Sequence, residues 1–155
     1  MLASCAEQPH ATRSAAAPVH RRLKVRTTAY AHGESGGHHN AVGARLSNHR
    51  CMSAASDWSR FPLGTRFRIV DTKEEYIIDD YGTALVGTNT IDLYKKSRLE
   101  MRRWGVRHVD IDILEWGSDA KSLTVLAPRS KNRSVQRMVV GLQKKTSFRF
   151  GRALD

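Results

Sequence analysis

The chain is short of the features that identify several large protein classes. Its only cysteines, Cys5 and Cys51, lie far apart and form no CxxC pair, so the sequence predicts neither a zinc site nor a disulfide framework. It contains no run of about 18 apolar residues and no internal repeat. With 155 residues, 40% of them hydrophobic, the chain can form one domain of modest size plus tails.

Acidic residues are in the minority, but the imbalance is confined to the two ends. The formal net charge is +11. Residues 1–26 hold five basic residues and one acidic residue, and residues 119–155 hold nine basic and two acidic ones, whereas residues 27–118 hold twelve of each. Because the middle of the chain is neutral, the positive excess does not describe a site there, and we do not expect nucleic acid to be the main partner.

The N-terminal segment has neither helical nor strand periodicity. Its content of Ala, Pro, Ser and His is typical of a disordered tether, which we expect over residues 1–22. The run Leu2-Ala3-Ser4-Cys5 resembles a bacterial lipobox, so lipidation of Cys5 is predicted, with coincidence as the alternative. Because the apolar stretch of a secretory signal does not precede Cys5, this interpretation also predicts a true start further upstream.

Short segments with strand periodicity dominate the middle of the chain. Residues 23–30 alternate between apolar and polar side chains, as a half-buried strand does. Residues 66–69 and 76–78 predict a hairpin, and residues 91–94 predict a further strand. Many short strands separated by turns indicate a small β-barrel over residues 23–116.

One short helix and a last strand complete this pattern. Ser97 and Glu100 form a capping-box pattern, which predicts a helix that ends at Gly105. Residues 109–113 then alternate between apolar and acidic side chains. The two aspartates in this strand are expected to point into solvent, so we do not count them as site candidates.

The C-terminal extension, residues 117–155, is strongly basic. Residues 122–127 are predicted to add an edge strand. Ser134 is predicted to cap a helix whose apolar residues recur at i, i+3, i+4 and i+7 from Val135. This basic amphipathic helix is compatible with packing on the barrel, lying on an anionic membrane surface or binding an acidic polymer, and the sequence does not separate these alternatives.

A series of motifs in the middle of the chain resembles a known family. In chain order the motifs are Thr28-Ala29-Tyr30, Ser56-Asp57 ahead of Pro62-Leu63-Gly64-Thr65, Asp79-Asp80-Tyr81-Gly82, Ile91-Asp92-Leu93-Tyr94 and Trp104-Gly105. Together they resemble the 3D (three-aspartate) domain, which occurs in membrane-bound lytic transglycosylase A and in bacterial stationary-phase survival proteins. The resemblance implies a mainly β fold, namely a six-stranded double-psi β-barrel.

The resemblance also implies a site built from three aspartates. Matched motif by motif, they are Asp57, Asp80 and Asp92. The aspartate of the Ile-Asp-Leu-Tyr motif is the family's catalytic residue, which implies that role for Asp92. Asp80 takes the supporting position, and Asp57 is implied as a neighbour. A purely local role, as a turn residue whose carboxylate bonds nearby amides, remains an alternative for Asp80.

Three further residues are predicted to bind the substrate. Tyr30 occupies the position of an aromatic residue that lines the family's groove, and Thr28 and Tyr81 belong to the same motifs. His32, His38 and His39 cluster near a glycine-rich loop and, with Glu34, are a candidate metal site. Because they show no spacing typical of zinc ligands, we expect a solvated loop, with no metal and no cofactor.

The chemistry implied is cleavage of a glycosidic bond. This reaction needs an acid to protonate the leaving oxygen, and a carboxyl serves only if an apolar wall or neighbouring carboxylates raise its pKa. The resemblance therefore implies a lytic transglycosylase that acts on peptidoglycan glycan strands. A non-catalytic, cell-wall-binding carbohydrate barrel is the first alternative, and binding of nucleic acid or an anionic membrane through the basic tails is the second.

The same resemblance implies where the protein acts. We expect a monomer in the cell envelope, held at a membrane and facing the wall if Cys5 carries a lipid. The basic tails would then meet anionic envelope polymers or the membrane surface.

Overall fold

Six strands close into a barrel. In a computed structural model that describes residues 21–31 and 38–151, the strands are β1 (Arg21–Ala31), β2 (Met52–Ser56), β3 (Arg66–Ile69), β4 (Glu75–Tyr81), β5 (Thr90–Lys95) and β6 (Arg107–Glu115). Their order around the barrel is β1-β5-β2-β4-β3-β6. β1 pairs with β5 and β2 with β4 in parallel, whereas the other neighbours are antiparallel. The protein is therefore mainly β, as predicted, and the closed mixed barrel fits a double-psi fold.

Alternating apolar side chains fill the barrel. The core residues supplied by the strands are Val25, Ala54, Phe67, Ile69, Tyr76, Ile78, Ile91, Leu93, Val109, Ile111 and Ile113. The alternation predicted for residues 23–30, 66–69 and 109–113 is confirmed in β1, β3 and β6, and the strands predicted at residues 76–78 and 91–94 are present within β4 and β5. The predicted solvent-facing aspartates of β6 are half-buried, and Asp112 forms an ion pair with Arg22 at 2.8 Å.

Strand β2 was missed by the sequence analysis. Its sequence, Met-Ser-Ala-Ala-Ser, lacks the β-branched and aromatic residues that mark strands. In the barrel it lies between β5 and β4, where four of its five residues are buried. Small side chains suit this position because both faces of the strand are covered.

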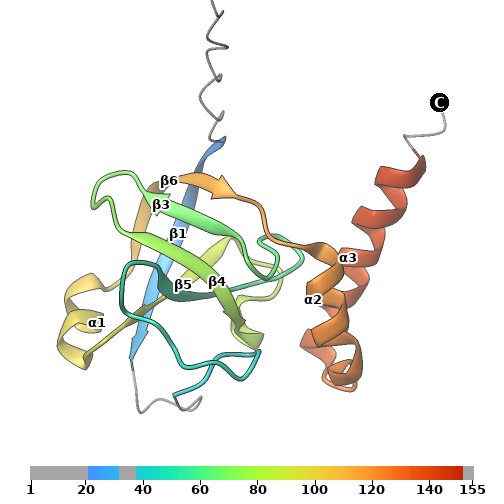
Figure 1. The fold of residues 1–155 in the computed structure, drawn as a ribbon, viewed down its shortest axis with the longest axis horizontal. Helices are drawn as coiled ribbons and strands as arrows, with labels where there is room; N and C mark the ends of the chain where they lie inside the picture. The colour runs from blue at the N-terminus through green and yellow to red at the C-terminus, as the bar shows by residue number, and fades with distance from the viewer. Residues whose placement is uncertain (1–20, 32–37, 152–155) are drawn as a thin grey trace, which may run out of the picture.

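Helix α1 (Arg98–Trp104) lies at one end of the barrel, away from the other two helices (Figure 1). The Ser97 hydroxyl accepts a hydrogen bond from the amide of Glu100 at 3.2 Å, which confirms the predicted cap. Gly105 ends the helix with a φ of 64°, a conformation that glycine adopts at low cost.

The predicted edge strand at 122–127 is wrong, because this segment is helical. Helix α2 (Asp119–Leu126) begins after Ser118, whose side chain accepts a hydrogen bond from the amide of Lys121 at 3.1 Å. The Ser122 hydroxyl accepts a hydrogen bond from the Leu63 amide at 2.9 Å, which ties the helix to the barrel.

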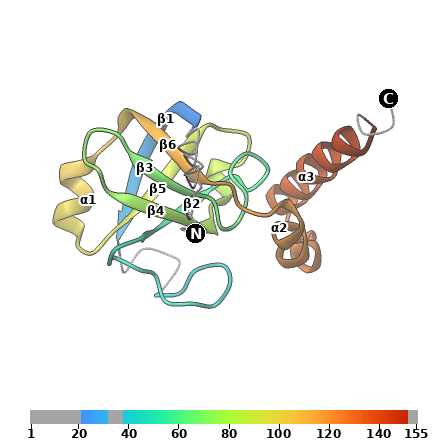
Figure 2. The same cartoon turned by 45° about the horizontal axis from the view of Figure 1, so that its top comes forward.

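The predicted amphipathic helix is present and longer than expected. Helix α3 (Arg133–Gly151) follows a 3-10 turn, η2 (Ala127–Arg129), and projects beyond the barrel (Figures 1 and 2). Its cap is Asn132 instead of Ser134, because the Asn132 side chain accepts hydrogen bonds from the amides of Ser134 and Val135. Among the described helices, none has the length and apolar character needed to cross a bilayer.

Helix α3 packs through the predicted apolar stripe. Its buried members Val135, Met138 and Leu142 belong to the same hydrophobic cluster as Trp58 and Phe61 of the barrel domain. Of the three arrangements left open for this helix, its apolar face is thus used for packing within the chain. Only its basic, solvent-exposed face remains available to a partner.

Candidate functional site

Four residues line up across adjacent strands. Strand pairing places Thr28 of β1 opposite Asp92 of β5, and Asp92 opposite Ala55 of β2. Ala55 is in turn paired with Asp80 of β4. Directly paired residues direct their side chains to the same face of a sheet, so the two aspartates share one face, with the small Ala55 between them. Two strand spacings place their Cα atoms about 10 Å apart.

This face lies on the outer side of the barrel. Ile91 and Leu93, the sequence neighbours of Asp92, point into the core and are fully buried. Asp92 itself is half-buried, and its carboxylate accepts a hydrogen bond from the Thr28 hydroxyl at 2.7 Å. The structure thus joins two of the predicted site residues directly.

Asp80 has an unusual protonation behaviour. Burial raises the pKa of its carboxyl to about 6, and the nearby charge of Asp79 acts in the same direction. Hydrogen bonds from the backbone amides of Tyr81 and Ala41 and the charge of Arg129 oppose this rise. A carboxyl with this pKa retains a proton in a fraction of molecules near neutral pH, which a general acid requires.

Asp79 lies beside Asp80 and was not among the residues predicted from the sequence. The register of β2 and β4 shifts between Ala54 and Ala55, so that Asp79 forms a bulge in β4. Its Oδ2 accepts hydrogen bonds from Ser53 at 2.6 Å and Asn40 at 2.9 Å. Burial raises the pKa of the Asp79 carboxyl, and those two bonds oppose the rise. Two consecutive aspartates in a strand were the available signal, because strict alternation cannot accommodate both on one face.

Tyr30 lies among these carboxyls. Its pKa is raised, chiefly by burial and further by the charges of Asp80, Asp79 and Asp92. Its ring contacts that of Tyr94, with the centroids 5.4 Å apart. The Tyr30 hydroxyl is buried and has no hydrogen-bond partner among the described residues. The predicted aromatic residue therefore stands at the aspartate face with its polar end unsatisfied.

Asp57 is separate from this row. It is 2% exposed, and its Oδ1 accepts hydrogen bonds from the Ser59 amide and hydroxyl at 2.8 and 2.7 Å. Its Oδ2 accepts one from the Gly87 amide at 2.7 Å. With both oxygens bonded inside the protein, Asp57 fixes the connection that leads into β5 and presents no free carboxylate oxygen at the surface.

Tyr81 is directed toward the C-terminal extension. Its ring packs edge-on against Trp58, at a centroid distance of 5.2 Å, and its hydroxyl accepts a hydrogen bond from Arg129 at 3.4 Å. The indole N–H of Trp58 donates to the backbone oxygen of Asp80 at 2.8 Å. Trp58 therefore holds the Asp80 backbone through a hydrogen bond, and Tyr81 packs against Trp58.

A similarity to a known domain family covers the middle of the chain. Residues 52–115 match the 3D domain. The chain contains a 3D domain. No curated protein matches the chain in a sequence comparison.

The matched range ends with the last strand and begins at β2. The 3D domain match thus includes Asp57, Asp80 and Asp92 but not β1. β1 supplies Thr28 and Tyr30 and closes the barrel between β5 and β6.

Two other expectations concern residues that the structure does not describe. Cys5 and most of the predicted tether lie in residues 1–20, and His32 and Glu34 lie in residues 32–37. Within residues 21–31 and 38–151, no group of three or more His, Cys, Asp or Glu side chains is arranged to hold a metal ion.

Proposed function

We propose that this 3D domain cleaves peptidoglycan glycan strands as a lytic transglycosylase, with Asp92 as the acid and base. The observation that carries the proposal is the half-buried row in which Asp92, Ala55 and Asp80 are paired across three strands. Ala55, 6% exposed, separates the two carboxyls with a small side chain. Tyr30 and Thr28 border the same row.

The proposed reaction uses one carboxyl twice. Protonated Asp92 gives its proton to the glycosidic oxygen as the bond to C1 of the muramyl residue breaks. The resulting carboxylate then takes the proton of the C6 hydroxyl, whose oxygen bonds to C1 and gives a 1,6-anhydro product. No water molecule enters the product, and Asp92 ends in the protonation state in which it began.

The neighbouring groups support this cycle. Asp80, whose pKa is raised to about 6, holds a proton in part of the molecules at mildly acidic pH and then adds no negative charge to the row. The Thr28 hydroxyl orients the Asp92 carboxylate. Asp57 acts as a positioning residue.

Mass spectrometry of muropeptides released from purified peptidoglycan tests the proposal. The wild type is compared with Asp92→Asn, which keeps the shape of the side chain but cannot shuttle a proton. Asp110→Asn is the matched control, because Asp110 is a half-buried aspartate on β6, outside the proposed row. We expect anhydromuramyl ends from the wild type and from Asp110→Asn, and at least a hundredfold fewer from Asp92→Asn.

Two results would contradict this expectation. Release of anhydromuramyl ends by Asp92→Asn at the wild-type rate would remove Asp92 from the mechanism. If the wild type binds glycan but does not cleave it, the lytic transglycosylase proposal is wrong and the protein is a carbohydrate-binding barrel.

On this proposal the protein works in the cell envelope. A lipid on Cys5 would hold the barrel at a membrane facing the wall. The basic side chains on the exposed face of α3, among them Arg133, Arg137 and Lys144, would meet anionic envelope polymers or the membrane surface.

A further inference from the structure

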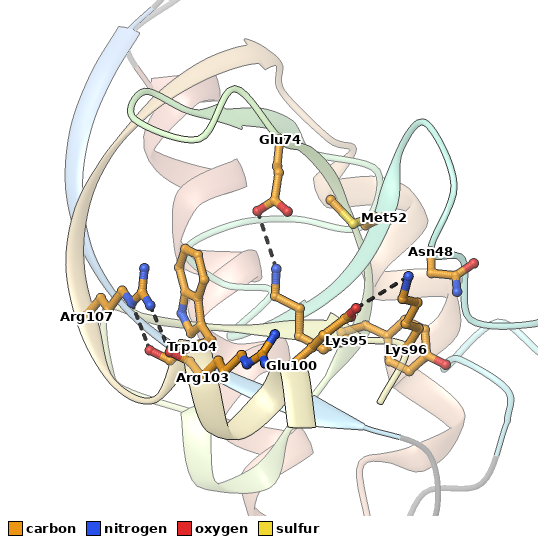
Figure 3. Close-up of a pocket in the computed structure, with 10 residues that line it drawn as sticks. Asn48, Met52, Glu74, Lys95, Lys96, Glu100, Arg103, Trp104 and Arg107 are labelled. Carbon is orange, nitrogen blue, oxygen red and sulfur yellow. Dashed lines mark hydrogen bonds and ion pairs between the residues drawn. The ribbon is translucent and has the colours of Figure 1, made fainter. Parts of the chain in front are cut away.

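A cavity lies at the end of the barrel that α1 covers (Figure 3). Its volume is about 330 Å³. None of the three predicted aspartates lines it. Its charged lining residues are Lys95, Lys96, Arg103, Arg107, Glu74 and Glu100. Cations thus outnumber carboxylates two to one, in contrast to the acidic row.

The cations of this cavity differ in how far they are already paired. Lys95 is 8% exposed and bonds to the Tyr76 hydroxyl at 2.7 Å and to Glu74 at 3.3 Å. Arg107 donates to the backbone oxygens of Arg103 and Trp104, both at 2.8 Å. Because their side chains already bond within the protein, Lys95 and Arg107 stabilise this end of the barrel.

Arg103 and Lys96 are different. Lys96 is exposed and forms an ion pair of 3.4 Å with Glu100 across one helical turn, a contact of little energetic weight. The Arg103 guanidinium forms no ion pair with any described residue. The mouth of the cavity therefore offers a guanidinium and an ammonium group to an anion from solution.

The cavity and the aspartate row share one strand and one aromatic pair. Asp92 and Tyr94 alternate along β5 and belong to the same face, and Lys96 follows directly after the end of the strand. Tyr94 lines the cavity, and its ring contacts Tyr30 beside the aspartates. Four residues of extended chain place Lys96 about 13 Å from Asp92, which is the length of a short peptide.

We propose that this cavity binds a carboxylate of the peptide that branches from the glycan strand, while the sugar chain lies along the aspartate row. The inference rests on the proposed function for its substrate. Arg103 is the main anchor because a guanidinium pairs with a carboxylate through two parallel hydrogen bonds, and Lys96 adds a second positive charge. The acidic row takes the uncharged sugar, and the cationic cavity selects strands that carry acidic peptides.

Binding of two defined probes tests the assignment. One is a disaccharide that carries an acidic tetrapeptide, and the other is the same disaccharide without the peptide. Affinities are measured by titration calorimetry for the wild type, Arg103→Ala and Arg102→Ala. Arg102 is the matched control because it is the exposed neighbour in the last turn of α1 and does not line the cavity.

We expect Arg103→Ala to weaken binding of the peptide-bearing probe by about tenfold or more and to leave the peptide-free probe unchanged. Arg102→Ala should bind both probes as the wild type does. A weaker affinity of Lys96→Ala for the peptide-bearing probe, with Arg98→Ala unchanged as its control, would support the same assignment. Circular dichroism establishes that each variant is folded.

The outcomes separate this inference from the proposed function. Peptide-dependent binding that is lost in Arg103→Ala supports the cavity even where the wild type releases no anhydromuramyl ends. Equal affinity of wild type and Arg103→Ala for the peptide-bearing probe overturns it, even where cleavage is observed. Inorganic phosphate is added as a competitor for the peptide-bearing probe, and Arg102→Ala should respond to it as the wild type does. If the cavity binds phosphate as tightly as it binds the peptide-bearing probe, then it binds simple anions without preference for the peptide, and the inference is overturned.

Discussion

Replacing Asp80 by asparagine should stabilise the protein near neutral pH. The folded protein raises the pKa of Asp80 from 3.8 to about 6, so folding favours the protonated carboxyl. Between about pH 4 and pH 6 the folded state then binds more protons than the unfolded state, and the free energy of unfolding falls as the pH rises through that window. Asparagine cannot ionise and avoids this loss.

The pKa difference sets the size of the effect. Its full value corresponds to about 3 kcal/mol. Because Asp80 is only half-buried, solvent screens part of its charge, and we expect Asp80→Asn to gain about 1.5 kcal/mol above pH 7. Below about pH 4 the carboxyl is protonated in both states, so the gain should vanish there. The asparagine oxygen can still accept the hydrogen bond of the Tyr81 amide, which Asp80 now accepts at 2.9 Å.

Urea unfolding of both proteins at a series of pH values from 4 to 8 measures this difference. Asp71→Asn is the control, because Asp71 is exposed in the turn between β3 and β4. If the two unfolding free energies of wild type and Asp80→Asn stay parallel over the whole range, then burial does not raise this pKa, and the acid-base argument for the row loses its electrostatic support. If Asp71→Asn gains as much unfolding free energy as Asp80→Asn does, then the gain does not come from the burial of Asp80, and the same support is lost.

Three further substitutions test the packing and the site. Leu142→Ala should cost about 2–5 kcal/mol in urea unfolding, because Leu142 is fully buried, whereas Val140→Ala on the 43% exposed Val140 should change little. Gly117→Ala should lower the melting temperature markedly, because an added Cβ would collide with the backbone oxygens of Pro62 and Leu63; an unchanged melting temperature would contradict this close approach. Thr28→Val removes the hydroxyl that donates to Asp92 and should lower the release of anhydromuramyl ends about tenfold without loss of folding; an unchanged rate would exclude orientation of Asp92 by this bond.

The sequence predicted the parts of the fold that carry a strong local signal. The Phe67 and Ile69 alternation, the Ser97 cap and the Gly105 stop all depend on residues within one turn or strand, and each is confirmed. Strand β2 carries no such signal, because its small residues are explained only by the strands on either side. For α2, Ser118 followed by Asp119 was an unused start signal, since an N-cap and an acid in the first turn favour a helix.

The site shows the same division between local and distant information. Motif order identified Asp92 and Asp80, but only strand register shows that Ala55 separates them. Register depends on how β2 fits between two strands from other parts of the chain, which no local pattern contains.

The bonding of Asp57 and Asp79 suggests how the three-aspartate pattern works in this chain. Asp57 uses both oxygens to hold Ser59 and Gly87, so its contribution is to fix the connection into β5. Asp79 keeps one oxygen bonded to Asn40 and Ser53 and leaves the other without a partner among the described residues, beside Asp80. Burial raises the pKa of Asp80 most, and the carboxyl that adds to this rise is Asp79, its neighbour in the bulge. Without the bulge, strict alternation after the inward-pointing Ile78 would direct Asp79 outward and Asp80 toward the core, so an insertion into β2 that restored regular pairing with β4 should remove Asp80 from the row.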